Sequence, residues 1–151
     1  MKILIQCFSK PLKHGKENPK NYPYWETLID GMYIAGYDVI QIGSSQEKKM
    51  CEHFVKDANF AQLMELLKDC DLFICVDSFL QHMAHYYGKK GIVLFGPSDP
   101  SLFGYKENVN LYNEPSRFRE NQYDIWENAV FDAQAFVTPD VVLNVLSRWN
   151  K

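Results

Sequence analysis

Apolar residues fall along the chain in two alternating patterns. Short continuous runs, which are typical of buried strands, occupy residues 2–8, 38–43, 72–76 and 92–95, and residues 108–112 are a shorter candidate. Between these runs, apolar residues recur at i, i+3, i+4 and i+7, the spacing of one helix face. These helical stripes begin at Trp25, Phe60 and Leu80. Alternating apolar strands and helices predict an α/β fold: a doubly wound, Rossmann-like domain whose parallel sheet carries helices on both faces.

Local signals mark where several of these helices begin and end. Gly36 and Gly88 follow the first and third stripes, and glycine is favoured just after the end of a helix. Thr138 and Pro139 precede a fourth apolar stripe, in the order typical of a helix start. Residues 115–134 show no clean period, so we expect them to form mainly loop.

Composition narrows the class of protein. The chain has 151 residues, of which 46% are hydrophobic and 23% charged, so it has globular composition and enough length for one core. We expect residues 1–151 to form a single domain. The net charge of −3 argues against a broad nucleic-acid surface. No apolar run approaches the ~18 residues of a membrane span and no signal peptide is evident, so we expect a cytoplasmic protein.

The four cysteines fit a reducing environment. Cys7, Cys51, Cys70 and Cys75 form no C-x-x-C pair, and two of them lie inside apolar, strand-like runs. Buried free thiols are therefore expected rather than a disulfide framework. A zinc site would need closer Cys and His spacing, so we expect no metal.

Ligands of open parallel sheets bind beyond the carboxyl ends of the strands, which makes the residues after each strand candidates for a site. Asp77 and Ser78 follow the third strand and precede a helix that carries His82. The backbone N–H groups and the dipole at such a helix start favour a phosphate. Plain helix capping by Asp77 or Ser78, and an ordinary surface position for His82, are the alternatives.

Three other strand ends supply further candidates. Gly96 and Ser98 lie in a G-P-S-D-P stretch, where glycine permits close approach of a ligand, although these residues are also typical of a plain turn. Lys20 lies in a Lys-rich stretch just before a helix start, where its ammonium can reach a bound anion. Gly43 and Glu47 follow the second strand. A carboxylate there can accept from ribose hydroxyls or serve as a first-turn helix charge.

Together these motifs resemble the nucleotide-sugar-binding half of the family 9 glycosyltransferases, the heptosyltransferase family, whose members have two Rossmann-like (GT-B) domains. The family's D-[ST]-G-x-x-H-x-A corresponds to residues 77–84 (DSFLQHMA), G-K-P to 88–90 (GKK), F-G-x-[ST]-x-P to 95–100 (FGPSDP), K-x-W-P to 20–23 (KNYP) and G-x-x-x-E to 43–47 (GSSQE). They occur in the family's order within residues 2–112. The resemblance implies the fold of the carboxyl-terminal half of a GT-B transferase.

The resemblance also implies roles for individual residues. By analogy with the family, Lys20 would contact a diphosphate and Glu47 would lie near the nucleoside. The helix start after the third strand would cradle phosphate and sugar, and the F-G-x-[ST] loop would border the same pocket. The implied ligand is a nucleotide diphosphate or nucleotide-sugar, with adenine or another purine preferred, and no further cofactor is expected.

Two departures from the family pattern bear on function. Phe79 stands where the family has glycine, which reshapes the phosphate cradle, and Lys90 replaces a proline. The chain begins at what resembles the family's second half, so we expect the acceptor domain and its catalytic base to be absent. Two functions remain open: a stand-alone domain that binds and sequesters a nucleotide ligand, or the donor-binding subunit of a transferase that acts with a partner chain.

Aromatic residues make up 15% of the chain and crowd into its last third. They are Phe103, Tyr105, Tyr112, Phe118, Tyr123, Trp126, Phe131 and Phe136. A domain of this size has limited interior for so many rings, and aromatic side chains are enriched at the centres of interfaces. We therefore expect a homodimer to which the segment after Tyr105 contributes. The alternative is that residues 115–134 fold back and bury their own rings.

Overall fold

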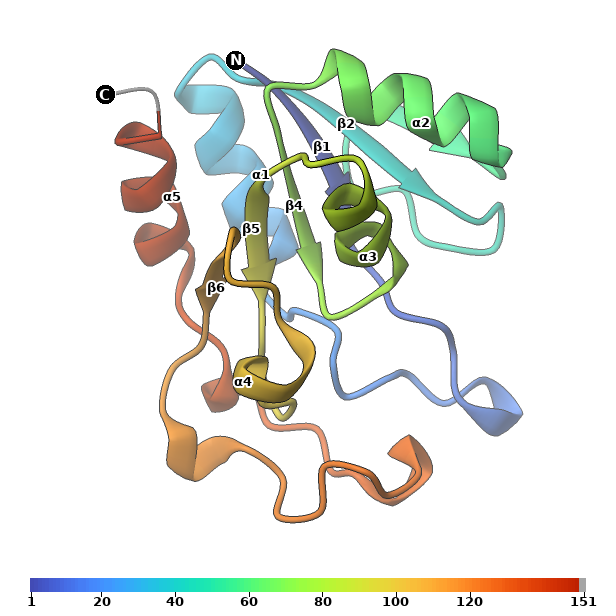
Figure 1. Cartoon of the computed structure of the whole chain (residues 1–151), viewed down its shortest axis with the longest axis vertical. Helices are drawn as coiled ribbons and strands as arrows, with labels where there is room; N and C mark the ends of the chain where they lie inside the picture. Colours follow the sequence, from blue (N-terminus) through green and yellow to red (C-terminus); the bar gives the residue numbers. More distant parts are fainter. Residues whose placement is uncertain (150–151) are drawn as a thin grey trace.

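A six-stranded sheet forms the centre of the structure, a computed structural model that describes residues 1–149 (Figure 1). All neighbouring strands run parallel, in the order β3-β2-β1-β4-β5-β6. The strands are β1 (Lys2–Gln6), β2 (Asp38–Gly43), β3 (His53–Lys56), β4 (Leu72–Val76), β5 (Gly91–Leu94) and β6 (Val109–Leu111). The strand order reverses direction between β1 and β4, which confirms the doubly wound, Rossmann-like fold.

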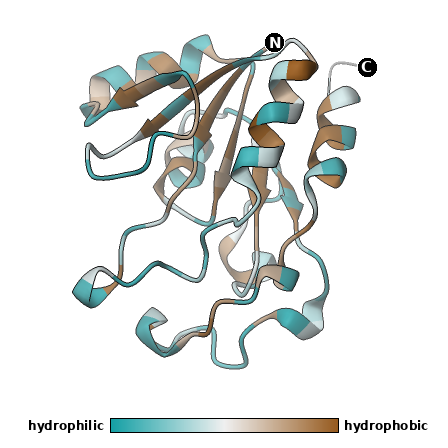
Figure 2. Cartoon of the chain, turned by 180° about the vertical axis from the view of Figure 1, so that it is seen from behind, coloured by the Kyte–Doolittle hydropathy of each residue, from teal (hydrophilic) through white to brown (hydrophobic). Residues whose placement is uncertain are grey.

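Helices cover both faces of the sheet (Figure 1). They are α1 (Trp25–Ile34), α2 (Phe60–Asp69), α3 (Phe79–Tyr86), the short α4 (Pro100–Phe103) and α5 (Pro139–Ser147). Helices α1 and α5 pack on one face, and α2 and α3 pack on the other. Figure 2 shows the α1 and α5 side, where apolar colour runs along the strands and polar colour dominates the loops beyond their ends.

Each central strand contributes side chains to two apolar layers. In β1, Ile3 and Ile5 belong to the layer under α1 and α5, whereas Leu4 belongs to the layer under α2 and α3. All three side chains are fully buried. Burial on both faces explains why the central strands read as continuous apolar runs in the sequence.

The predicted helix-ending glycines are confirmed. Gly36 has a φ of +78° and Gly88 a φ of +68°, a left-handed conformation that side chains disfavour. After α1, the N–H of Gly36 donates to the carbonyl of Tyr33, and the N–H of Tyr37 donates to that of Met32. This pair of bonds is the Schellman motif, which satisfies carbonyls left open at the helix end.

The structure differs from the sequence expectations in three elements. Strand β3 was not predicted, because it is a short edge strand whose two apolar residues, Phe54 and Val55, are only partly buried. Strand β1 ends at Gln6 and not at residue 8. The turn after β5 contains the short helix α4, which begins because Asp99 accepts from the N–H of Ser101 at 2.8 Å.

All four cysteines are free and buried, as expected, and each apolar layer contains two of them. Cys7 and Cys51 lie in the layer under α1 and α5, and Cys70 and Cys75 lie in the other. Burial raises the pKa of every one of these thiols. In the described part of the chain, no helix combines the length and apolar character needed to cross a membrane.

The carboxyl ends of the strands point to one edge of the sheet, where the long loops gather (Figure 1). The loop after β1, the β4–α3 turn and the segment after β6 all lie at this edge. The amino terminus and the end of α5 lie at the opposite side of the sheet. Parallel strand direction therefore brings together segments that are far apart in the sequence.

Candidate functional site

A cleft of about 1040 Å³ lies at the carboxyl ends of β1, β2 and β4. Its lining comes from the loop after β1, the turn after β2, the β4–α3 turn and a late segment of the chain. The lining side chains that the sequence predicted as site residues are Lys20, Glu47, Asp77, Ser78 and His82. The cleft is large enough for a small-molecule ligand and lies at the switch point, where such folds bind ligands.

Lys20 and Asp77 form an ion pair at the bottom of this cleft. The Lys20 ammonium lies 3.7 Å from Oδ2 of Asp77, and the two side chains are only 17% and 9% exposed. The other carboxylate oxygen of Asp77 accepts a 2.7 Å hydrogen bond from the amide of Gln81, which lies on α3. Because both oxygens of Asp77 are engaged, the carboxylate holds the Lys20 ammonium at a fixed place in the cleft.

Ser78 is the residue that precedes α3, and its backbone is extended there. Its hydroxyl donates to the side-chain carbonyl oxygen of Gln6 at 2.7 Å, and the N–H of Leu80 donates to the same oxygen at 3.0 Å. Gln6 at the end of β1 therefore supplies the acceptor at this helix start, in place of capping by Asp77 or Ser78. Phe79, the departure from the family pattern, lines the cleft with its ring about half exposed.

Ser9 and Asn21 are buried polar residues that the sequence analysis did not single out. The Ser9 hydroxyl donates to the backbone carbonyl of Asp77 at 2.9 Å, and the Ser9 N–H donates to the Asn21 side chain at 2.8 Å. These bonds fasten the loop after β1 to the end of β4. The asparagines within the Lys-rich stretch are the feature of the sequence that could have indicated an ordered loop.

Gly43 and Glu47 lie together at the end of β2. A Cβ at Gly43 would collide with the Glu47 carboxylate, so the glycine makes room for that group. Glu47 lies in a turn and not in the first turn of a helix, which removes the helix-charge alternative. Burial raises the pKa of Glu47, although hydrogen bonds from Ser44 partly oppose the shift. Within residues 1–149, Oε2 of Glu47 has no hydrogen-bond partner and is packed against Gly43, shielded from solvent.

His82 lines the cleft from the exposed side of α3. Its Nδ1 lies 2.8 Å from the hydroxyl of Tyr105, which comes from the loop before β6. The Tyr105 ring also stacks on His85, with ring centroids 3.9 Å apart. Tyr105 thus fixes the orientation of the His82 imidazole at the mouth of the cleft.

Gly96 and Ser98 lie at the same sheet edge but do not line the cleft. A Cβ at Gly96 would overlap the ring of Phe136, so this glycine is required by packing against the carboxyl-terminal segment. Ser98 is fully buried, and its hydroxyl has no hydrogen-bond partner among the described residues. A direct contact of either residue with a ligand stays a prediction.

Residues 119–128, here called the cap loop, close one side of the cleft. The N–H of Arg119 and the side chain of Gln122 both donate to the carbonyl of Pro97, at 2.9 Å. At its other end, the Glu127 carboxylate accepts from the N–H of Lys13 at 3.3 Å. The cap loop therefore connects the loop after β5 to the loop after β1.

Trp126 is the aromatic residue of the cap loop that lines the cleft. The Lys20 ammonium lies 5.2 Å from its ring centroid, and the Arg119 guanidinium carbon lies 4.4 Å from it. Both distances are in the range of cation–π attraction. The sequence analysis noted Trp126 only as part of the aromatic load and did not place it beside Lys20.

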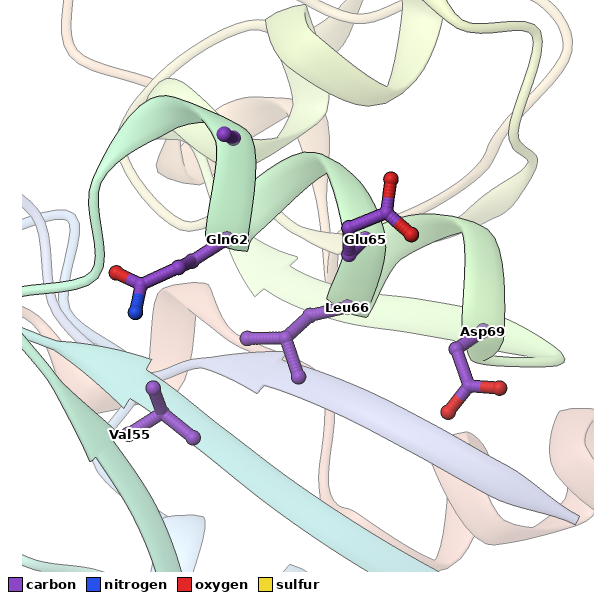
Figure 3. A pocket seen from close by; sticks show the side chains of 6 residues that line it. Val55, Gln62, Glu65, Leu66 and Asp69 are labelled. Atoms are coloured by element: carbon purple, nitrogen blue, oxygen red, sulfur yellow. The ribbon is translucent and has the colours of Figure 1, made fainter.

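A second hollow, of about 580 Å³, lies between α2 and the edge strand β3 (Figure 3). It is lined by Val55, Ala61, Gln62, Glu65, Leu66 and Asp69. Its only charged lining groups are carboxylates, which repel anions, and it contains no predicted site residue. Among residues 1–149, no cluster of three or more His, Cys, Asp or Glu side chains could hold a metal ion.

A doubly wound parallel sheet with a cleft at its switch point is the architecture of one half of a GT-B protein. The chain belongs to glycosyltransferase family 9 (heptosyltransferase), whose model matches residues 12–123. A comparison with curated protein sequences found no significant relative.

Solved heptosyltransferase structures share the fold. Dodecameric iron-containing heptosyltransferase TibC, solved with ADP-D-beta-D-heptose, is 16% identical with a TM-score of 0.70 over 99% of this chain. The ADP-heptose LPS heptosyltransferase II of E. coli is 16% identical with a TM-score of 0.65 over 97% of it. E. coli heptosyltransferase WaaC, solved with ADP, is 15% identical with a TM-score of 0.68, also over 97%. The matched regions span 45%, 45% and 43% of those three chains, so this chain corresponds to somewhat less than half of each.

Proposed function

We propose that the chain binds a nucleoside diphosphate or nucleotide-sugar in the cleft at the carboxyl ends of β1, β2 and β4. The observation that carries this proposal is the Lys20 ammonium, held in the cleft by Asp77 and largely shielded from solvent. A shielded ammonium attracts a phosphate more strongly than an exposed one, because water screens it less. The hydroxyl of Ser78 and the start of α3 lie beside the same cleft.

The positions of the polar groups suggest how such a ligand lies. A diphosphate next to Lys20 places the nucleoside toward Glu47, because the turn after β2 borders the same cleft. The Glu47 carboxylate lines this side of the cleft and would accept from ribose hydroxyls. Two of the similar heptosyltransferases, TibC and WaaC, were solved with ADP-heptose and ADP, which makes an adenine nucleotide the first ligand to test.

A second function, donor binding within a sugar transferase, is favoured by membership of family 9. In such a reaction the sugar leaves with negative charge developing on the diphosphate, which Lys20 and the start of α3 would stabilise. The residues that bind the acceptor and act as base would lie in the other half of such a transferase. We expect residues 1–151 alone to give no product in a single-turnover assay with ADP-heptose and candidate acceptors, and transfer at ordinary enzyme rates without a second protein would refute the binding-only proposal.

Calorimetry with ADP and ADP-heptose tests the binding proposal directly. Lys20→Ala should weaken binding by about 1.5–3 kcal/mol, the range for hydrogen bonds to charged groups, which corresponds to roughly 10- to 150-fold. Lys90→Ala is the matched control, because Lys90 is an exposed lysine beside the amino end of β5. It removes the same charge from the opposite edge of the sheet and should leave the affinity unchanged.

Two results would count against this assignment. If the unaltered chain binds neither compound at millimolar concentration, the cleft is not a nucleotide site. If Lys20→Ala and Lys90→Ala bind as tightly as the unaltered chain, Lys20 does not contact the ligand. Native mass spectrometry of the purified protein adds an independent measurement, because it reports a co-purified ligand and its stoichiometry together.

A further inference from the structure

Trp126 lies in the cleft close to Lys20, the residue proposed to bind the phosphate of the ligand. The ammonium of Lys20 lies 5.2 Å from the centroid of the indole ring, and both residues line the same cleft. A phosphate oxygen that accepts from this ammonium lies about 2.8 Å from the nitrogen. A group attached to that phosphate on the side of the cap loop is therefore within reach of the indole.

The order of the strands indicates which end of the ligand meets Trp126. Glu47 follows β2, and Lys20 and Asp77 follow β1 and β4, so these groups succeed one another across the sheet. The cap loop is bonded to the loop after β5 at the carbonyl of Pro97 and to the loop after β1 at Glu127, so it reaches from β5 to β1, whereas Glu47 lies beyond β1 at the end of β2. A nucleotide with its ribose at Glu47 and its diphosphate at Lys20 thus directs its far end toward the cap loop.

The cap loop holds the indole in place through Arg119. This guanidinium donates to the carbonyls of Asp124 and Ile125 at 3.2 Å and lies against the Trp126 ring. The Arg119 side chain is itself nearly buried. The indole is therefore presented by an ordered loop, so little conformational entropy has to be lost when a ligand packs on it.

We propose that Trp126 recognises the sugar of a nucleotide-sugar, with the cap loop as the wall that distinguishes this ligand from the plain nucleoside diphosphate. The inference rests on the proposed function and adds a specificity-determining residue to it. An indole offers a broad apolar surface, against which the C–H face of a sugar ring can pack. The neighbouring Ile125 extends the apolar part of this wall.

The test measures the affinities of ADP and ADP-heptose by calorimetry for the unaltered chain and for Trp126→Ala. We expect the unaltered chain to prefer ADP-heptose and Trp126→Ala to lose about tenfold in affinity for it, which is ~1.4 kcal/mol. The affinity for ADP should fall by less than about threefold, or ~0.65 kcal/mol. Ile34→Ala is the matched control, because it shortens an 89% exposed apolar side chain at the end of α1, away from the cleft, and it should change neither affinity.

Trp126→Phe keeps an aromatic surface and guards against a folding defect in the alanine variant. It should retain most of the preference for ADP-heptose, and it should abolish any quenching of tryptophan fluorescence by the ligand. Equal loss of affinity for both ligands, or no loss for either, overturns the assignment of Trp126. A chain that binds ADP and ADP-heptose equally overturns this inference and leaves nucleotide binding intact, whereas a chain that binds neither overturns both.

Discussion

The two walls of the cleft are held in place by different interactions. One wall is built on the sheet: Asp77 and Ser9 are buried, and their bonds join the ends of two neighbouring strands. The other wall is the cap loop, whose only regular structure is a single 3₁₀ turn. Side chains of Arg119, Gln122 and Glu127 fasten it to nearby backbone groups.

This difference separates the wall of the cleft that also supports the fold from the wall that does not. The groups on the sheet wall are fixed by strand pairing and by the apolar layers, so changing them disturbs the domain. The cap loop is fixed by a few polar contacts that bury little apolar surface, and contacts of this kind contribute about 0.5–1.5 kcal/mol each. The cap loop can therefore be altered, in the laboratory or by natural variation, without unfolding the sheet.

The largest expected effect is on the mass of the protein in solution, which reports its oligomeric state. The cap side of the molecule has exposed apolar side chains, including Tyr123, which is 79% exposed, together with Val130 and Phe131. We expect this surface to be covered in a homodimer, because aromatic side chains at an interface centre contribute strongly to association. Sedimentation at micromolar concentration should then give about twice the 17.6 kDa of one chain.

The fold-back alternative holds only in part, since within residues 115–134 Phe118 and Trp126 are half-buried whereas Tyr123 and Phe131 are exposed. A sedimentation mass of a single chain at every concentration would show that the remaining exposed rings do not mediate association. A dimer that persists in Tyr123→Ser with Phe131→Ser would place the interface elsewhere on the molecule.

The next-largest expected effect is on the free energy of unfolding and comes from substitution of Gly96. Gly96→Ala introduces a methyl group that overlaps the Phe136 ring, and overpacking of this kind costs about 1–3 kcal/mol. Urea denaturation should show this loss, whereas Ser101→Ala, at an exposed position of α4, should not. By contrast, Trp126→Ala should change the free energy of unfolding by at most about 1 kcal/mol. If Gly96→Ala instead weakened ADP binding at unchanged stability, the glycine would face the ligand after all.

The smallest effect is the pH dependence contributed by Glu47. Its pKa is raised by burial in the folded chain, so its ionised form is less favourable there than in the unfolded chain. Folding stability is therefore lost as the pH rises through the folded pKa. Glu47→Gln should be more stable than the unaltered chain at pH 7, by less than about 1 kcal/mol because the carboxylate is partly solvated.

The difference in stability between Glu47→Gln and the unaltered chain should vanish at low pH. Below the unfolded pKa of about 4.3, Glu47 is neutral in both states and the glutamine mimics it closely. Thermal unfolding of both proteins between pH 4 and pH 8 measures this trend. A stability gap that does not depend on pH would mean that the side chain acts through packing alone.

The sheet wall was accessible to sequence analysis for a physical reason. Buried parallel strands need continuous apolar runs, and β2 and β4 were predicted with the bounds that the structure shows. Once the strands are known, parallel direction alone brings the residues that follow them to one edge. The strand pattern in the sequence therefore predicts a common site for Lys20, Glu47 and Asp77.

The cap loop and several of its contacts could not be predicted in this way. Its residues show no period, because irregular backbone is not repeated and each contact is specific to one side chain. The contact between Lys20 and Trp126 spans more than a hundred residues, and nothing near either residue indicates it. Gln6 was missed for a related reason: its oxygen caps a helix that begins far along the chain. Strand β3 was missed because its position at the edge leaves it only partly buried.

Alkylation of the four buried thiols can report how often the apolar layers of the protein open locally. Two lie on each side of the sheet, and a thiol reacts with an alkylating reagent only when it is both exposed and deprotonated. In the folded chain burial prevents both, so modification requires the surrounding layer to open. The order in which Cys7, Cys51, Cys70 and Cys75 react therefore records which side of the sheet opens first, and how often.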